Sequence, residues 1–251
     1  MVDESEYFEA IDNNDIEKVK KILRYENVNI QGVYGSDNEG LTPLNVAYFL
    51  QRIEIVKLLL AYPKTNINLK DTYGTTILDL VSKVYNKEIA ELLLSNPKIN
   101  VNVKDVDSTT PLHTACKYNN IEIVKLLLAH PNIDINSQDR WIETPLIKAC
   151  YSNSIEIVKL LLFRSDIDVT LKVKIGYALK NINKYDFKNI DNVNLLCFVC
   201  QMRYVEIVKL LLSHPKIIID YNEFIKFPKA KSVFKNYSKK NIDNILDRIE
   251  N

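Results

Sequence analysis

The sequence predicts an all-α solenoid of about six helix–turn–helix units, joined by short β-hairpin fingers. The first observation behind this prediction is a repeated apolar stretch. EIVKLLL begins at Glu54, Glu122, Glu156 and Glu206, and a close copy, EIAELLL, begins at Glu88. In chain order, Glu54, Glu88, Glu122 and Glu156 follow one another at intervals of 34 residues along the 251-residue chain. A fixed period of this length is typical of a stacked helical repeat.

A second motif lies twelve residues before each of these glutamates and predicts the first helix of a unit. It reads TPL at Thr42, Thr110 and Thr144 and TIL at Thr76, and it decays to NLL at Asn194. Threonine supplies an N-cap oxygen, and proline fits the first helical turn, where its missing N–H costs no hydrogen bond. In one unit we therefore expect a first helix over about 110–118 and a second helix over about 121–129.

The apolar composition of the second helix explains why the unit repeats. Between Ile121 and Ala129, all residues except Glu122 and Lys125 are apolar. A helix that is apolar around most of its girth must be covered on nearly all sides. One helix pair cannot provide this cover, whereas stacked neighbours can. Each fully buried leucine then contributes about 1.5–3 kcal/mol to the free energy of unfolding.

The order of hairpin turn, TPLH and EIVKLLL resembles the ankyrin repeat over about residues 3–215. The resemblance implies an array over 1–222 with units at 3–36, 37–70, 71–104, 105–138, 139–172 and 189–222. An insertion at about 163–188 breaks the period, and Val173 to Asn181 is a candidate extra helix. The insertion is either a binding loop or a degenerate repeat. The tail at 223–251 carries an apolar stripe, including Ile242 and Ile245, which favours a helical C-terminal cap.

Glycine is scarce at positions where the ankyrin family usually has it. The turn between the two helices of each unit instead holds Asn14, Gln51, Tyr85, Asn119, Asn153 and Arg203. Asparagine tolerates the left-handed backbone conformation best among non-glycine residues. At the finger, glycine survives as Gly40 and Gly74 but is replaced by Ile142 in a later unit. A β-branched residue resists positive φ, so the geometry of that finger is left open.

The candidates for chemistry are better explained by packing. Cys197 and Cys200 form a CxxC motif, but no second ligand pair lies nearby in the sequence, so a metal or redox site is the weaker alternative. Cys116, Cys150 and Cys200 share one repeat position, at which the family places a small core residue. The resemblance implies that His113 ties the helix to its loop. We therefore expect no enzyme activity, no cofactor, no metal site and no small-molecule substrate.

Composition restricts the cellular setting and the partner. The net charge is +1, which favours neither nucleic acid nor an anionic membrane surface. No window of 18 apolar residues is present, and the acidic N-terminus lacks a leader core. We expect an intracellular, cytoplasmic monomer. An alternative is a binder of nucleic acid or of an acidic surface through the six lysines between 226 and 240.

The resemblance also implies where a protein partner would bind. In the family, the concave face binds the partner through the finger tips and the exposed ends of the first helices. Carried over to this chain, the expected contact residues are Tyr73, Lys83, Asp107, Lys117, Tyr118, Arg140, Trp141, Glu143 and Tyr151. Tryptophan, tyrosine and arginine dominate interface energetics. Phe49 and Leu50 occupy equivalent positions, but they have an alternative role in packing against the 34–37 loop.

Overall fold

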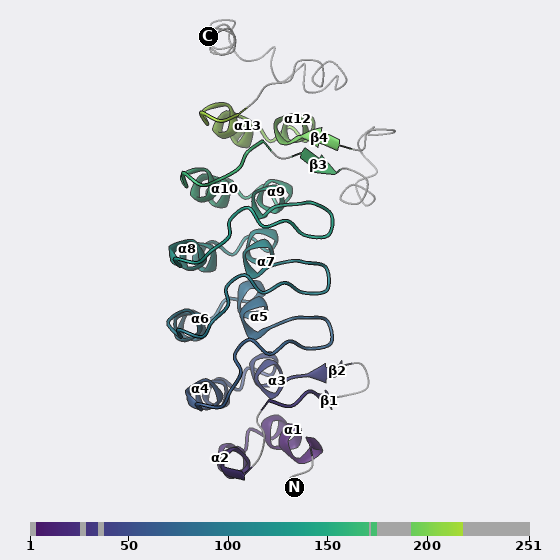
Figure 1. The fold of residues 1–251 in the computed structure, drawn as a ribbon, viewed down its shortest axis with the longest axis vertical. Helices are drawn as coiled ribbons and strands as arrows, with labels where there is room; N and C mark the ends of the chain where they lie inside the picture. Colours follow the sequence, from purple (N-terminus) through teal and green to yellow (C-terminus); the bar gives the residue numbers. More distant parts are fainter. Residues whose placement is uncertain (1–3, 26–28, 35–37, 171, 175–191, 218–251) are drawn as a thin grey trace, which may run out of the picture. The chain divides into compact units, whose positions relative to one another are not determined.

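The computed structural model describes residues 4–25, 29–34, 38–170, 172–174 and 192–217. The chain divides into two compact units, Met1–Arg140 and Trp141–Asn251. Each unit is built of antiparallel helix pairs, as the sequence predicts (Figure 1). The predicted cap at 223–251 and its lysine-rich segment lie outside the described residues, so both stay predictions.

The first unit contains four helix pairs stacked in sequence order (Figure 1). Their bounds are α1 (Glu4–Asp12), α2 (Ile16–Tyr25), α3 (Pro43–Phe49), α4 (Ile53–Ala61), α5 (Ile77–Lys83), α6 (Lys87–Leu94), α7 (Pro111–Lys117) and α8 (Ile121–Ala129). The first helices α1, α3, α5 and α7 pack on one another in one layer. The second helices α2, α4, α6 and α8 form the other layer.

The second unit contains the pairs α9 (Pro145–Tyr151) with α10 (Ile155–Leu162) and α12 (Leu195–Gln201) with α13 (Val205–Leu212). Helix α10 packs against α13. Strand β3 (Lys172–Lys174) pairs antiparallel with β4 (Asn192–Asn194), and Val173 lies opposite Val193. The predicted helix over 173–181 is therefore wrong at its start, because Val173 belongs to a strand. The rest of that segment lies outside the described residues.

A finger is the loop that leads from one second helix to the next first helix. The finger before α3 is a hairpin of β1 (Gly32–Tyr34) and β2 (Asn38–Leu41), with Gly32 opposite Leu41. The fingers before α5, α7 and α9 reverse the chain through tight turns without paired strands. In the second unit, the break in the sequence period falls between α10 and α12, where the described residues include the paired strands β3 and β4.

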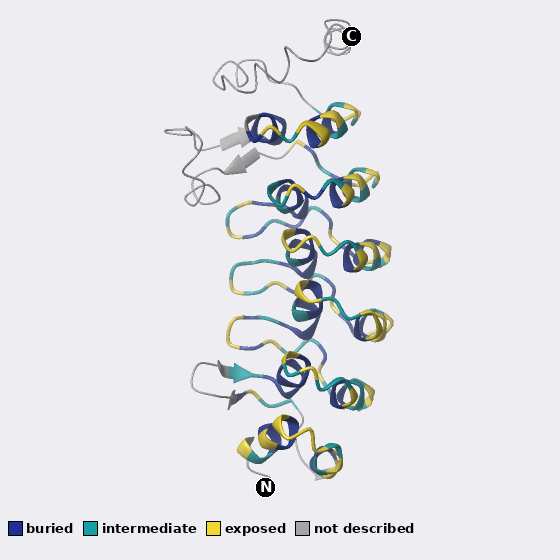
Figure 2. Cartoon of the chain, turned by 180° about the vertical axis from the view of Figure 1, so that it is seen from behind, coloured by how far each residue is buried: buried dark blue, intermediate teal, exposed yellow. Residues whose placement is uncertain are grey.

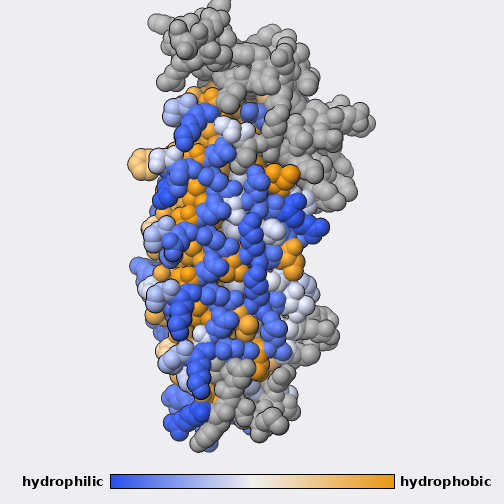
Figure 3. Space-filling model, in the orientation of Figure 1, coloured by the Kyte–Doolittle hydropathy of each residue, from blue (hydrophilic) through white to orange (hydrophobic). Residues whose placement is uncertain are grey.

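Burial follows the pattern of the repeated stretch. In α8, Ile123, Val124 and Leu127 are completely buried, whereas Glu122 and Lys125 are exposed and paired at 2.8 Å. Figure 2 shows the same division along the first unit, with buried inner faces and exposed outer faces on the second helices. Viewed as a space-filling surface, this unit is largely hydrophilic, with hydrophobic atoms visible between the second helices (Figure 3).

Threonine caps start α3, α5, α7 and α9, as predicted. The Thr42 hydroxyl accepts a hydrogen bond from the Asn45 amide at 3.1 Å. Two repeats later, at the start of α7, His113 Nδ1 accepts a hydrogen bond from the Thr110 backbone N–H at 3.2 Å and lies 2.7 Å from the Thr110 hydroxyl. His113 is completely buried. Its role is therefore the predicted one of tying the helix start to the preceding loop.

Non-glycine residues adopt positive φ at most of the turns between paired helices. Asn14, Gln51, Asn119, Asn153 and Arg203 do so, with φ between 50° and 61°. The α5–α6 turn is the exception, because its C-cap residue is extended and the Asn86 side chain caps α6 by accepting from the Ile89 amide at 3.1 Å.

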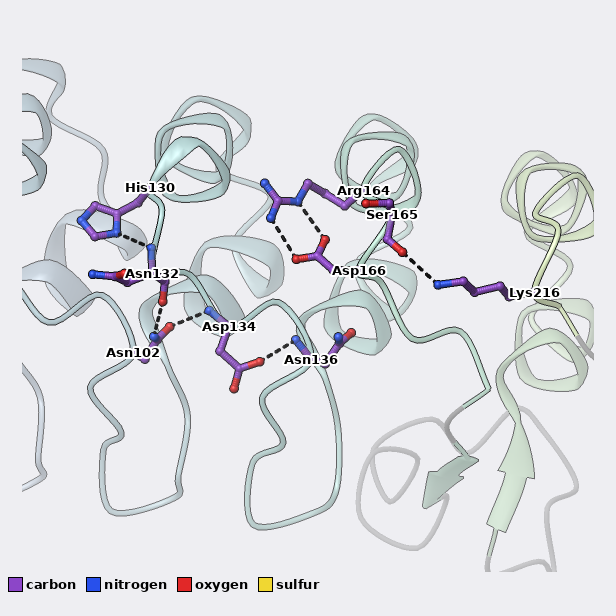
Figure 4. A network of polar contacts seen from close by, with 9 residues as sticks. All are labelled: Asn102, His130, Asn132, Asp134, Asn136, Arg164, Ser165, Asp166 and Lys216. Atoms are coloured by element: carbon purple, nitrogen blue, oxygen red, sulfur yellow. Dashed lines mark hydrogen bonds and ion pairs between the residues drawn. The ribbon is translucent and has the colours of Figure 1, made fainter.

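A ladder of asparagine side chains joins successive repeats through the loops that follow the second helices. The Asn68 amide group donates to the Lys98 carbonyl at 2.7 Å, and its oxygen accepts from the Asn100 N–H at 2.9 Å. One repeat later, Asn102 makes both bonds again, with the Asn132 carbonyl at 2.6 Å and the Asp134 N–H at 2.9 Å (Figure 4). Each asparagine therefore satisfies one donor and one acceptor of the following loop.

Candidate partner-binding surface

Two finger tips of the first unit are held by aspartates, of which Asp71 is buried and Asp105 is partly buried. The Asp71 carboxylate accepts the N–H groups of Tyr73 at 2.9 Å and Thr75 at 2.8 Å. Asp105 does the same for Asp107 at 2.9 Å and Thr109 at 2.7 Å. Burial raises the pKa of both aspartates above its usual value. These bonds fix the backbone of each tip, so the side chains that follow are presented in a set direction.

Neighbouring finger tips of the first unit are also joined to each other. The Val106 N–H donates to the Tyr73 carbonyl at 3.1 Å, and the Arg140 N–H donates to the Asp107 carbonyl at 2.8 Å. The guanidinium of Arg140 lies 2.7 Å from the Asp107 carboxylate. Two of the predicted contact residues therefore pair with one another. Because both are solvent-accessible, the pair contributes little to stability and can exchange with a partner's charges.

Lys83, Lys117 and Tyr118 are three predicted contact residues that the structure brings together. The ammonium of Lys83 lies 5.3 Å from the centre of the Tyr118 ring, and that of Lys117 lies 5.7 Å from it. Both distances fall within the range of about 6 Å in which a cation is attracted to an aromatic ring. Tyr118 is nevertheless 46% exposed, so the ring is accessible from outside.

The ends of the first helices form one continuous feature of the first unit, which we call the first-helix strip. It consists of the last residue and the C-cap residue of α3, α5 and α7, namely Phe49, Leu50, Lys83, Val84, Lys117 and Tyr118. The three helices pack side by side, α3 against α5 and α5 against α7. The strip therefore runs across three repeats within one unit.

The strip exposes two apolar residues at repeat positions equivalent to those of the predicted contacts. Phe49 is 68% exposed and Val84 is 57% exposed. Packing against the 34–37 loop is the alternative role of Phe49, and residues 35–37 of that loop lie outside the described residues. Its repeat position, shared with Lys83 and Lys117, is the signal in the sequence that it faces outward.

Predicted contact residues of the second unit form a partly buried network. Glu143 is only 3% exposed; its carboxylate pairs with the Lys148 ammonium and accepts from the Tyr151 hydroxyl at 2.7 Å. The Lys148 ammonium also lies 5.3 Å from the centre of the Trp141 ring. Glu143 thus orients the side chains of Lys148 and Tyr151, and because it is buried it is not positioned to contact a partner directly.

Tyr151 and Trp141 keep part of their surface accessible. The Tyr151 ring packs edge-on against Phe198 of α12, with ring centres 4.9 Å apart. One side of Tyr151 is therefore committed to the core of the second unit. Trp141 is held by the cation of Lys148, which makes it a pre-oriented aromatic group at a finger tip.

The cysteines lie in the core. Cys116, Cys150, Cys197 and Cys200 are all buried, and none of them is in a disulfide. Burial raises the pKa of Cys200 to about 12, and the pKa of Cys150 is raised for the same reason. Such thiols stay protonated at neutral pH and are poor nucleophiles. Across the described residues, no group of three His, Cys, Asp or Glu side chains is arranged to hold a metal ion.

Two histidines at helix ends also have local structural roles. His130 Nδ1 accepts from the Asn132 N–H at 3.3 Å, as Figure 4 shows, and His214 Nδ1 accepts from the Lys216 N–H at the same distance.

Within the described parts of the chain, no helix is long and apolar enough to cross a membrane.

Comparisons with known proteins agree with this geometry. The family described as ankyrin repeats in three copies matches residues 7–105 and also residues 80–173, which together make up more than half of the chain. The crystal structure of EF0377, an ankyrin repeat protein, is similar with a TM-score of 0.67 and 25% sequence identity. That likeness covers 85% of this chain and 100% of the other. A search of the curated proteins finds no match.

Ankyrin repeats are generally protein–protein interaction modules, and the fold is typically non-enzymatic. The matched residues include the threonine caps, the second helices α4, α6, α8 and α10, and the finger tips described above. The predicted ankyrin-repeat fold is confirmed, and this chain belongs to the ankyrin-repeat family.

Proposed function

We propose that this protein is a non-enzymatic scaffold or adaptor that binds a protein partner through its finger tips and first-helix ends. The distribution of exposed apolar side chains in the first unit carries the proposal. Its exposed large hydrophobic residues at finger tips and first-helix ends are Phe49, Tyr73, Val84, Val106 and Tyr118. Among the residues of this unit that the structure describes, Leu92 on α6 is the exposed large hydrophobic residue that lies elsewhere. Exposed apolar residues gathered on one side of a molecule are typical of an interaction surface.

The second helices present a different chemistry. Their exposed faces carry regular ion pairs, such as Glu54 with Lys57 at 2.9 Å and Glu122 with Lys125 at 2.8 Å. Surface pairs of this kind are well solvated and contribute little to binding or stability. The contrast between the two layers favours the finger and first-helix side as the place where a partner docks.

The second unit offers a separate anchor on the same kind of position. Trp141 and Tyr151 are large aromatic residues whose orientation is set by Lys148 and Glu143. Aromatic side chains that are already ordered lose little conformational entropy on binding. We therefore include Trp141 and Tyr151 in the proposed contact set, together with Tyr73, Asp107, Arg140 and the first-helix strip.

We further propose that the protein works as a monomer inside the cell, in the cytoplasm. Four buried cysteines that are not in disulfides support the intracellular setting, since oxidising compartments favour disulfides.

Site-specific photo-crosslinking tests the proposed function. A photoreactive amino acid is placed at Phe49 in the strip or, as the matched control, at Leu92 on α6, and the full chain is exposed to extract of the source cells. We expect a specific protein to be captured from position 49 and not from position 92. Equal capture from both positions, or capture only from position 92, would refute the proposed surface.

A further inference from the structure

The first-helix strip combines two features that together indicate the chemistry of its partner. Its apolar side chains, Phe49 and Val84, are more than half exposed. Its charged residues are Lys83 and Lys117, both exposed, and the six strip residues include no acidic residue. A surface of this composition favours a ligand that carries carboxylates beside an apolar group.

The arrangement of the two lysines sharpens this expectation. Both ammonium groups approach the ring of Tyr118, at 5.3 Å and 5.7 Å from its centre. Two positive charges that share one ring repel each other, and the ring's quadrupole offsets only part of that repulsion. A carboxylate placed beside Tyr118 would interact favourably with both lysines at once.

We propose that the first-helix strip binds an acidic segment of the partner protein, with carboxylates facing Lys83 and Lys117 and an apolar side chain covering Val84 and Phe49. This inference rests on the proposed function and adds the chemical class of the partner. The positions on α3, α5 and α7 are joined by direct helix packing, so the strip is a preformed surface. A short peptide segment is long enough to contact all three repeats.

Nucleic acid is the competing ligand class, since bases stack on tyrosine and phosphates pair with lysine. Two observations favour protein. Phe49 and Val84 offer apolar area that a phosphate backbone does not use, and the net charge of the chain is only +1. Proteins that bind nucleic acid strongly usually present a much more basic surface.

Selection from a random peptide display library against the full chain tests the inference and does not require the natural partner. Two variants are selected in parallel. Lys83→Glu/Lys117→Glu reverses the strip charge, and Lys57→Glu/Lys125→Glu makes the same change in net charge on α4 and α8. Circular dichroism establishes that each variant is folded before selection. A labelled oligothymidylate tests nucleic acid binding on the same proteins.

We expect the wild-type chain to enrich peptides rich in Asp and Glu that also contain an aromatic or aliphatic residue. Their affinity should fall at least about tenfold in the strip variant, stay nearly unchanged in the α4/α8 variant, and decrease with added salt. Neutral or basic peptides that lose binding on Tyr118→Ser would overturn the acidic partner but leave the proposed function standing.

Two other outcomes also count against the inference. Enriched peptides that bind equally well after Phe49→Ser and Tyr118→Ser would refute both the acidic partner and the proposed surface. Oligothymidylate binding that is lost in the strip variant, or a selection in which no peptide is enriched, would overturn the acidic peptide assignment.

Discussion

Asp79 accepts two hydrogen bonds from Thr76 at the start of α5, one from its amide at 2.9 Å and one from its hydroxyl at 2.7 Å. His113 occupies the equivalent position two helices later and makes the corresponding contacts with Thr110. The carboxyl and the imidazole thus perform the same capping task. They differ in cost, because a buried carboxylate must give up its hydration.

Stability should depend on pH through Asp79. Burial raises its pKa from the ordinary value of 3.8 to about 6. Between pH 4 and 6 the folded state therefore binds more protons than the unfolded state, and the free energy of unfolding falls as pH rises through this window. In Asp79→Asn this contribution is absent, so the variant should gain about 1–3 kcal/mol relative to wild type between pH 4 and 7. Urea unfolding at both pH values measures the change, and a constant difference between the two proteins would contradict it.

The buried ion pair of the second unit should be sensitive to single substitutions. Glu143→Gln leaves the Lys148 ammonium without its carboxylate in a largely buried place. We expect the free energy of unfolding to fall by about 3–5 kcal/mol. The double variant Glu143→Gln/Lys148→Met should recover most of the loss, because no buried charge remains. Fluorescence of Trp141 follows the unfolding of this unit, and additive effects of the two substitutions would argue against the pair.

Two equivalent finger positions should respond to substitution with opposite signs. Ile142 has φ of 65° and is 46% exposed. Ile142→Gly should raise the free energy of unfolding by about 0.5–1 kcal/mol, because relief of left-handed strain exceeds the entropic cost of glycine. The measurement is the shift in the urea midpoint, and a destabilised variant would show that the side chain contributes more through packing than it costs in strain.

Gly74 has φ of 75° at the corresponding position of the first unit. An added Cβ would lie 2.9 Å from both the Asp105 Cα and the Val106 nitrogen. These are backbone atoms of the next finger, so they cannot rotate away. Gly74→Ala should therefore destabilise the protein by about 2–3 kcal/mol in chemical unfolding. An effect below about 0.5 kcal/mol, the range of ordinary surface changes, would mean that the fingers are not held together as described.

The asparagine ladder should contribute measurably to stability. Asn68→Ala removes its side-chain bonds to Lys98 and Asn100. We expect a loss of about 1–2 kcal/mol in the free energy of unfolding, since each bond contributes about 1 kcal/mol net. Lys98→Ala is the matched control, because only the backbone carbonyl of Lys98 takes part and it remains. Equal effects of the two substitutions would show that the ladder is not responsible.

Regular features of the fold were predictable because they depend on local rules that repeat. The bounds of α7 and α8, the threonine caps and the buried positions of EIVKLLL follow from capping chemistry and helical periodicity. The departures have specific local causes. The α5–α6 turn avoids positive φ because Asn86 caps α6. Val173 joins a strand because it pairs with Val193, and this pairing was not predictable from local rules because the two residues are twenty positions apart in the chain.

The candidate site was less predictable because pairing between side chains decides which residues stay exposed. The sequence predicts that Glu143 contacts a partner, yet Lys148 and Tyr151 bury it. The sequence did contain a signal that Glu143 differs from its equivalents, since the corresponding residues of other repeats, Thr75 and Thr109, are uncharged. A lone carboxylate at such a position requires a nearby cation, and Lys148 follows one helical turn and a half later.

The affinity of the crosslinked partner for three purified proteins tests the central claim most directly. Isothermal titration calorimetry compares wild type, Phe49→Ser/Tyr118→Ser and the control Leu92→Ser, all verified as folded. The account predicts at least about a tenfold loss of affinity for the strip variant, equivalent to about 1.4 kcal/mol, and no loss for the control. Equal affinities of the strip variant and wild type would contradict the claim that the first-helix strip binds the partner.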